Sequence, residues 1–251
     1  MVIKVGAAIL TIGITIMNIT LVNSYEQGLK DEVAWPSPAS QGAVFDAPAA
    51  TSASFTSVSV PEEVKTRMIG NSYSAKAEIA FEELRYLRVL YYDFGGKISA
   101  GELVVNNAVS ADTLEIFKTL YDEKYPIAKM ALIDDFKGND NLSMARNNTS
   151  AFCWRDVDGS KVISMHAFGL AVDLNPVQNP MVTTGTDGIQ TVKPPEGAAY
   201  LDRTAQVTGL IVKGDVCYNA FISHGWEWGG DWTTMKDYQH FYKNVPGYEQ
   251  Q

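Results

Sequence analysis

The fold of this chain is constrained most by three short motifs in its C-terminal half, of which the first and the last each carry a histidine and an aspartate. The motifs are residues 164–173 (SMHAFGLAVD), 225–232 (GWEWGGDW) and 237–241 (DYQHF). Two histidines and one carboxylate form a three-ligand set that leaves one coordination position open for water, as catalytic zinc sites do. The motifs therefore predict a fold that brings these distant stretches together around one metal ion.

The N-terminal residues 1–24 have the composition of an export signal. They carry one cation, Lys4, followed by an apolar run from Val5 to Val22. This run is long for a cleavable signal peptide and short or polar for a membrane span, so cleavage and retention as a membrane anchor both stay open. In either case we expect the rest of the chain to work outside the cytoplasm, in the periplasm, in the cell envelope or as a secreted protein.

Residues 25–60 are rich in Ala, Ser and Pro, and such a composition buries too little apolar surface to fold alone. We interpret them as a linker. Residues 61–251 are numerous enough for one domain with its own core. The formal net charge of −9 argues against nucleic acid or an anionic membrane surface as the main partner. Membrane contact is expected only if the N-terminal segment is uncleaved, and a monomer is the default.

The chain has two cysteines, Cys153 and Cys217, and neither belongs to a CxxC pair. A four-thiolate zinc site is therefore excluded. In an oxidising compartment the two cysteines can form a disulfide, and two buried free thiols fit the sequence equally well.

Hydrophobic spacing predicts two amphipathic helices, over residues 75–93 and 111–125, the second with Ser110 as N-cap and Pro126 as its stop. Strand candidates follow, and they are residues 127–133, 152–157 and 167–174. This order predicts an α+β fold with helices packed on a mostly antiparallel sheet.

The spacing of His166 and Asp173 sets a requirement on the local backbone. They are an odd number of residues apart, so on a flat strand their side chains would point to opposite faces and could not share a metal. Gly169 lies between them. A glycine there permits a bulge, or a loop that carries His166 into the strand, and either restores convergence.

Asp237 and His240 are three residues apart, which places both on one face of a helical turn. This spacing predicts His240 as the third ligand and Asp237 as a general base beside the metal-bound water. The simpler alternative is an N-capping aspartate followed by a buried histidine. Residues 181–200 form a long connection rich in Gly, Thr and Pro. Long loops of this kind often bind substrate, so this segment is a candidate wall of the substrate groove. The simpler interpretation of each residue in it is an ordinary surface residue.

The pattern SxHxxGxAxD, followed by GWxWGGDW and DxxHF, resembles the zinc D-alanyl-D-alanine carboxypeptidase and L-alanyl-D-glutamate endopeptidase family, which cleaves peptidoglycan stem peptides. The resemblance also includes residues 147–152, Arg155 and residues 159–160 upstream, and residues 175–176 and 179–180 downstream, and it runs from about residue 67 to residue 242. It implies the hedgehog/DD-peptidase-like fold, which is α+β with a central, mostly antiparallel sheet flanked by helices.

Carried over residue by residue, the resemblance implies a Zn²⁺ site with His166, Asp173 and His240 as ligands. It further implies Asp237 as the catalytic base for hydrolysis of the peptide bond by a zinc-activated water. Arg155 takes the place of an arginine that binds the substrate carbonyl as it becomes an oxyanion, which is sensible because a fixed guanidinium stabilises developing negative charge. An ion pair without a catalytic role is the alternative for Arg155.

Ser164 is a candidate for positioning the substrate or a metal ligand through hydrogen bonds, and a plain turn residue is the alternative. His224 is the one histidine of the chain that lies outside these motifs. The motif order assigns the site without it, so we interpret it as structural. Whether the bond between two D-alanines or the bond between L-alanine and D-glutamate is cut depends on pocket shape and stays open.

Two other classes of function fit parts of the pattern. Two histidines and one aspartate also form the ligand set of non-haem iron oxygenases. In that family one residue usually separates the first histidine from the carboxylate, whereas six separate His166 from Asp173, and nothing in an oxygenase requires Asp237 beside the last ligand. A non-catalytic cell-wall-binding domain on the same fold is the second alternative.

Overall fold

The computed structural model of this protein describes residues 54–248. The strands are β1 (Thr56–Ser59), β2 (Leu84–Tyr92), β3 (Ile98–Asn106), β4 (Ala171–Asp173), β5 (Met181–Thr184), β6 (Gln190–Lys193), β7 (Glu227–Trp228), β8 (Met235–Asp237) and β9 (His240–Tyr242). The α-helices are α2 (Glu62–Met68), α3 (Asn107–Asp122), α4 (Asp140–Ala145) and α5 (Val216–Ser223). Between them lie short 3₁₀ segments, of which η4 (Met165–Phe168) matters most below.

The strands form three small sheets with the orders β1-β2-β3, β4-β9-β7 and β6-β5-β8. Within each sheet the described strands run antiparallel to their neighbours. The α+β class and the antiparallel pairing expected from sequence are therefore confirmed, with the strands divided among three sheets.

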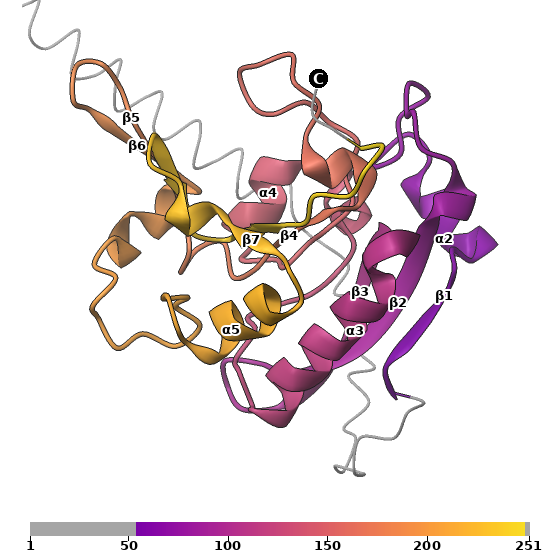
Figure 1. Cartoon of the computed structure of the whole chain (residues 1–251), viewed down its shortest axis with the longest axis horizontal. Helices are drawn as coiled ribbons and strands as arrows, with labels where there is room; N and C mark the ends of the chain where they lie inside the picture. The colour runs from indigo at the N-terminus through magenta and orange to yellow at the C-terminus, as the bar shows by residue number, and fades with distance from the viewer. Residues whose placement is uncertain (1–53, 249–251) are drawn as a thin grey trace, which may run out of the picture. The chain divides into compact units, whose positions relative to one another are not determined.

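Helix α3 lies along one face of the β1-β2-β3 sheet (Figure 1). The main core forms there, because Leu87 and Val89 of β2 pack with Ile116 and Phe117 of α3. A second core cluster includes Leu84 of β2 and the buried side of α2. The N-terminal sheet is thus covered on both faces near the start of β2.

This double coverage explains why the predicted helix at residues 75–93 is wrong. Residues 84–92 form β2, which pairs with β3 along its whole length. Leu84 belongs to one core cluster and Leu87 to the other, so they are buried on opposite faces of the strand. A strand buried on both sides loses the simple alternation, and its apolar residues then fall at helix-like spacings.

The predicted helix at residues 111–125 is confirmed as α3, which begins four residues earlier, at Asn107. Its N-cap is Asn106, whose side chain accepts a hydrogen bond from the Ala108 backbone N–H at 2.9 Å. Ser110, the expected cap, lies in the first turn and donates its hydroxyl to the Asn107 carbonyl at 3.1 Å.

Two of the three strand candidates are not strands. Residues 127–133 and 152–157 make only isolated bridges, such as Met130 with Thr149 and Asp156 with Ile163. The third candidate, residues 167–174, contains β4 after the η4 turn.

The folded part of the chain begins before residue 61, where the sequence places the end of the linker. Strand β1 pairs with β2, from Thr56 opposite Arg88 to Ser59 opposite Arg85. Pairing at a sheet edge satisfies the backbone of a segment that contributes little apolar surface of its own. The C-terminal boundary of the expected linker is therefore corrected, while residues 1–24 and the linker up to residue 53 lie outside the described residues.

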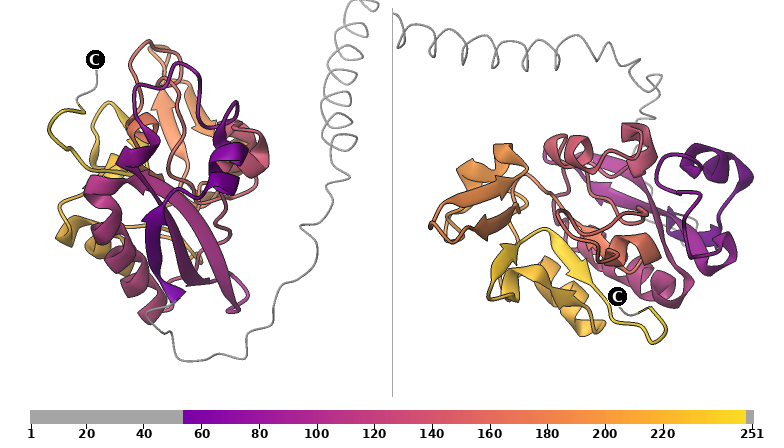
Figure 2. Two further views of the ribbon diagram at one scale, coloured as in Figure 1. Left: turned by 90° about the vertical axis from the view of Figure 1, so that its right-hand side faces the viewer. Right: turned by 90° about the horizontal axis from the view of Figure 1, so that it is seen from above.

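Residues 181–200, expected to be one long connection, contain the hairpin of β5 and β6 and a 3₁₀ turn. This hairpin projects at the end of the folded part opposite α2 (Figure 2). Cys153 and Cys217 are both buried and free, so they form no disulfide with each other. Within residues 54–248, no helix combines the length and the apolar character needed to cross a membrane.

Candidate metal centre

His166 is held on the short turn η4, which Ser164 caps. The Ser164 hydroxyl accepts a hydrogen bond from the His166 backbone N–H at 3.3 Å. The imidazole Nδ1 lies 2.6 Å from the carbonyl oxygen of Ala151, to which it donates. Because Nδ1 carries the proton, Nε2 presents a lone pair on the opposite side of the ring.

Gly169 produces the change of direction that the spacing of His166 and Asp173 requires. It ends η4 in the left-handed conformation, with φ +67°, and the chain then enters β4. A Cβ atom at this position would lie 2.6 Å from the backbone nitrogen of Asn106, which donates a hydrogen bond to the Gly169 carbonyl at 2.8 Å. His166 therefore lies on the turn that leads into the strand, which is one of the two arrangements that the sequence allows.

Asp173 and His240 converge through strand pairing. Asp173 ends β4 and lies directly opposite His240, the first residue of β9. Residues opposite each other on antiparallel strands present their side chains on the same face. The His166 turn closes over that face and completes the group.

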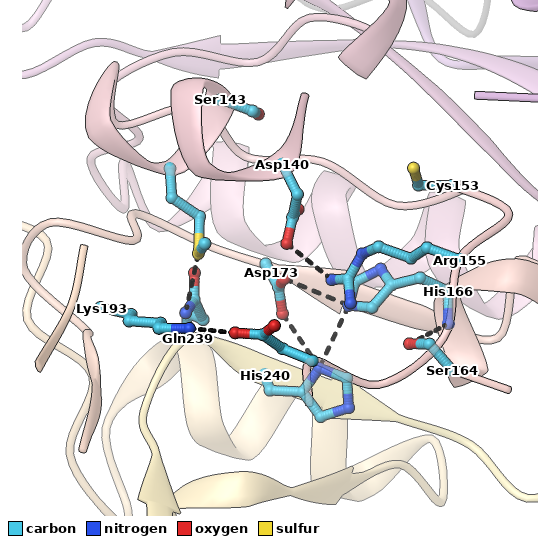
Figure 3. A network of polar contacts seen from close by, with 12 residues as sticks. Asp140, Ser143, Cys153, Arg155, Ser164, His166, Asp173, Lys193, Gln239 and His240 are labelled. Atoms are coloured by element: carbon cyan, nitrogen blue, oxygen red, sulfur yellow. Dashed lines mark hydrogen bonds and ion pairs between the residues drawn. The ribbon is translucent and has the colours of Figure 1, made fainter. Parts of the chain in front are cut away.

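The three side chains direct their donor atoms to one point (Figure 3). His166 Nε2 is 3.1 Å from Asp173 Oδ2 and 3.2 Å from His240 Nδ1, and His240 Nδ1 is 3.0 Å from Asp173 Oδ1. Tetrahedral bonds of about 2.0–2.1 Å to one zinc ion would separate the donor atoms by roughly 3.3 Å. All three residues are buried, and they form a group able to hold a metal ion.

The charges of Asp173 and the two histidines favour metal binding by these three residues. Burial raises the pKa of Asp173, but the two histidines outweigh burial and hold that pKa well below its ordinary value. A carboxylate this deeply buried requires positive charge beside it, and a metal ion bound between Asp173 and the imidazole nitrogens would supply that charge. The residues therefore fit a divalent ion with mixed nitrogen and oxygen ligands.

Asp237 lies beside the group, although not on a helical turn. It ends β8, which pairs with β5, whereas His240 begins β9, which pairs with β4. The predicted helical turn is therefore wrong, because strand partners from two different sheets extend the chain on both sides. Both side chains nevertheless line the same cavity.

The carboxylate of Asp237 is prepared to accept a proton. It is buried, and its Oδ1 has no hydrogen-bond partner within residues 54–248. Burial raises the pKa of Asp237 to about 7, against the opposing charge of His240. A carboxyl group with a pKa near neutrality is suited to general acid and base catalysis.

Arg155 also lines the cavity, and its guanidinium forms an ion pair with Asp140 at 2.9 Å. Its carbonyl oxygen accepts a hydrogen bond from the Ser164 backbone N–H at 3.1 Å, which ties it to the His166 turn. Burial lowers the pKa of Arg155, but the charges of Asp140 and Asp173 outweigh burial and raise it above its ordinary value. The guanidinium thus stays charged close to the metal-binding group.

The site opens into a cavity of about 790 Å³. One wall is a face of the β6-β5-β8 sheet, which contributes Asp237, Met181 and Lys193. Another wall is aromatic, because Trp232 and Tyr242 lie against the His240 ring with centroid separations of 5.5 and 5.6 Å. The cavity therefore surrounds the metal-binding group with both polar and apolar surfaces.

The motif GWEWGGDW supports the site without supplying a ligand. The Trp226 side chain is buried in the main core. The Trp228 indole donates its N–H to the Tyr238 carbonyl at 2.9 Å, between Asp237 and His240. The aromatic motif thereby holds the short link between β8, which ends at Asp237, and β9, which begins at His240.

Gln239 is a cavity residue that the motifs do not single out. Its side chain is 2% exposed and lies 3.5 Å, through Nε2, from the Met144 sulfur, while its Oε1 has no partner in the described part of the chain. The signal for it was its position two residues after Asp237, since alternate residues of an extended segment share a face. His224, in contrast, does not line the cavity and contacts the Ala220 carbonyl at 2.9 Å.

Comparison with known protein families matches residues 158–243 to a family model described as D-alanyl-D-alanine carboxypeptidase. Comparisons with curated proteins and with solved structures found no match. The matched range contains His166, Asp173, Asp237 and His240, and it begins just after Arg155. By this match, residues 158–243 are similar to the D-alanyl-D-alanine carboxypeptidase family, in agreement with the resemblance of the motifs.

Proposed function

We propose that this protein is a zinc-dependent peptidase that hydrolyses the stem peptides of peptidoglycan. One observation carries the proposal. The donor atoms of His166, Asp173 and His240 meet in the same cavity as the buried carboxylate of Asp237, whose Oδ1 has no partner in the described part of the chain, inside the range that matches a carboxypeptidase family.

The ligand set favours zinc. Two imidazoles and one carboxylate leave a coordination position open, which distinguishes catalytic from structural zinc sites. Zinc in such a site supplies a Lewis acid that polarises a carbonyl and makes water more acidic.

The remaining steps belong to side chains of this chain. Asp237 accepts the proton of the attacking water and delivers it to the nitrogen of the leaving amine, so the peptide bond breaks without a covalent intermediate. Its raised pKa suits both roles, because the group takes up and releases a proton near neutral pH.

Under this proposal, Arg155 stabilises the negative charge that develops on the substrate carbonyl oxygen. Its guanidinium is held in place by Asp140 and lies close to Asp173, as the charge effects on its pKa indicate. A positioned cation stabilises an oxyanion more than a neutral carbonyl, and this difference lowers the barrier. Ser164 acts on the ligand, since its hydroxyl holds the backbone of His166.

The partner of the protein under this proposal is peptidoglycan, and its place of work is outside the cytoplasm. The apolar N-terminal run of residues 1–24 supports export, as a cleaved signal or as an anchor. Immunoblotting of cell fractions with and without a signal-peptidase inhibitor tests this localisation. Accumulation of full-length protein in the cytoplasm would contradict it.

The activity is tested by incubating the purified protein with peptidoglycan fragments, with added zinc or with a chelator, and identifying the products by mass spectrometry. Release of D-alanine indicates a carboxypeptidase, and a cut after L-alanine indicates an endopeptidase. Asp237→Ala and His240→Ala are expected to abolish either product. A folded, zinc-loaded protein that binds the wall without cutting it would replace the proposal with a wall-binding module.

A further inference from the structure

The small sheet β6-β5-β8 places three cavity side chains in one row. Met181 on β5 lies opposite Lys193 on β6 and also opposite Asp237 on β8. Residues opposite each other in antiparallel strands project from the same face. All three side chains line the cavity, so the row crosses its wall from the candidate base to a lysine.

The spacing of this row leaves room for one extended residue of substrate, about 3.5 Å long, and for the side-chain stem of Lys193. Neighbouring strands are about 4.8 Å apart, so the backbones of Asp237 and Lys193 are separated by roughly 10 Å. Asp237 serves the nitrogen of the leaving amine under the proposed function. The flexible four-carbon stem of Lys193 can bring its ammonium to a carboxylate that lies a single residue beyond that nitrogen.

The charges of the cavity make a cation at this point necessary for an acidic substrate. The lining includes five carboxylates, from Asp140, Asp156, Asp158, Asp173 and Asp237. A further carboxylate entering with the substrate is repelled and loses hydration unless it meets a cation.

Within the described part of the chain, the Arg and Lys side chains that line the cavity are Arg155 and Lys193. Arg155 is paired with Asp140 and lies close to Asp173 of the metal-binding group. Lys193 lies two strands away from the base and is therefore the cation placed for the far end of the substrate.

The present partner of Lys193 is easily replaced. Lys193 forms an ion pair with Asp158, whose side chain is 65% exposed, compared with 33% for Lys193. Ion pairs with an exposed member contribute little stability, because water screens and solvates the charges. A substrate carboxylate inside the cavity can therefore take the place of Asp158 at small cost.

We propose that Lys193 binds the free C-terminal carboxylate of the substrate, one residue beyond the bond that is cut, and that Asp158 is the counter-ion that this carboxylate displaces. The inference rests on the proposed function and deepens it. The free α-carboxylate of D-glutamate lies at the same distance beyond the bond after L-alanine, so the identity of the released product decides which of the two carboxylates Lys193 binds.

The experiment compares two substrates on the zinc-loaded protein, an acylated peptide ending in D-Ala-D-Ala and the same peptide with a C-terminal carboxamide. Wild type is expected to favour the acid in kcat/KM by roughly ten- to a hundredfold, the range for a hydrogen bond to a charged group. Lys193→Met is expected to remove this preference by raising KM for the acid, with little change for the amide. Lys193→Arg keeps the charge and is expected to retain most of the preference.

Asp158→Asn separates binding from a structural role of the ion pair. It breaks the same pair but leaves the cation, so kcat/KM for the acid is expected to stay the same or rise. If Asp158→Asn and Lys193→Met instead impair both substrates equally, the pair only holds the hairpin and the inference is overturned.

Wild type that cuts acid and amide equally also overturns the inference, and wild type that cuts only after L-alanine overturns the assignment of Lys193 to the C-terminal carboxylate, but both results leave the proposed peptidase standing. Failure of the proposed function looks different. In that case no zinc-dependent cleavage of any of these peptides is observed.

Discussion

Asp173 and His240 lie directly opposite each other on β4 and β9, with the His240 Nδ1 3.0 Å from the Asp173 Oδ1. Two of the three candidate ligands are therefore a cross-strand pair, and the third, His166, is held by the turn before β4. Metal binding and pairing of this sheet are coupled, since an ion that joins the two side chains also joins the two strands.

This coupling predicts that zinc raises the melting temperature of the protein. A ligand present at 100 times its Kd stabilises the folded state by about 2.7 kcal/mol, if the unfolded chain does not bind it. His240→Ala is expected to lose the shift, whereas His224→Ala, which changes a histidine outside the cavity, is expected to keep it. Differential scanning fluorimetry with zinc and with a chelator measures the effect, and an equal shift in both variants would argue against the site.

Asp237→Asn is expected to reduce kcat by roughly 10²–10⁴-fold, the usual contribution of general acid and base catalysis. The folded protein is expected to lose none of its zinc-dependent thermal shift, because Asp237 is not one of the three ligands. Peptide cleavage and fluorimetry on the same samples separate the two effects. Parallel loss of activity and of the thermal shift would instead make Asp237 part of the metal-binding group.

Asp237→Asn is also expected to make the metal-free protein more stable than wild type at high pH. The folded-state pKa of Asp237 is raised to about 7, so the folded protein holds the proton that the unfolded chain releases near pH 4. Stability from this group therefore falls as pH rises from about 4 to 7, and the penalty is complete above that window, on the order of 2–4 kcal/mol. Urea unfolding of wild type and variant at pH 4 and pH 8 checks this, with a difference expected only at pH 8.

Gly169→Ala is expected to destabilise the protein and weaken metal binding together. The added Cβ would meet the Asn106 backbone at 2.6 Å in a residue whose φ is +67°. The left-handed conformation alone costs about 1–3 kcal/mol in a residue other than glycine. Gly96→Ala is a matched control, because Gly96 has φ +76° and open space around its Cβ position.

The difference between these two alanine variants in urea unfolding measures the cost of the close contact. Zinc titration of both measures its effect on the site. Gly169→Ala with the stability and zinc affinity of Gly96→Ala would show that the contact with Asn106 does not position His166.

Gln239→Met is expected to lower kcat/KM by roughly tenfold with little loss of stability. Its buried Oε1 has no partner in the described part of the chain and faces the cavity, which suits an N–H group of the substrate. The variant keeps the volume and gives up a weak contact with the Met144 sulfur and the hydrogen bond by which Gln239 lowers the pKa of Asp237. If stability falls and kcat/KM does not, Gln239 is a structural residue.

Features of the site that depend on residues close together in the chain could be predicted from the sequence. Gly169 is the clearest example, because the odd spacing of His166 and Asp173 demands a break in the strand and glycine is the residue that permits it. The start of α3 was missed by four residues, because Ser110 and Asn106 both have side chains suited to an N-cap and only Asn106 occupies that place.

Features that depend on a distant strand could not be read in this way. Asp237 and His240 look like neighbours on a helix until β5 and β4 pair on either side of them. Lys193 comes close to the base only through the hairpin of β5 and β6, and its own segment reads as an irregular connection. Residues 84–92 were misread because two cores bury opposite faces of one strand.

The contact between Asn106 and Gly169 also bears on how the protein can be divided. The Asn106 side chain donates to the Phe168 carbonyl at 3.1 Å, its backbone holds Gly169, and Ala151 accepts the proton of His166. Asn106 and Ala151 both precede residue 158, where the segment that matches the family model begins. The segment that carries the ligands is therefore not a transplantable module, and any chimera or shortened version must bring along the N-terminal sheet that orients its first histidine.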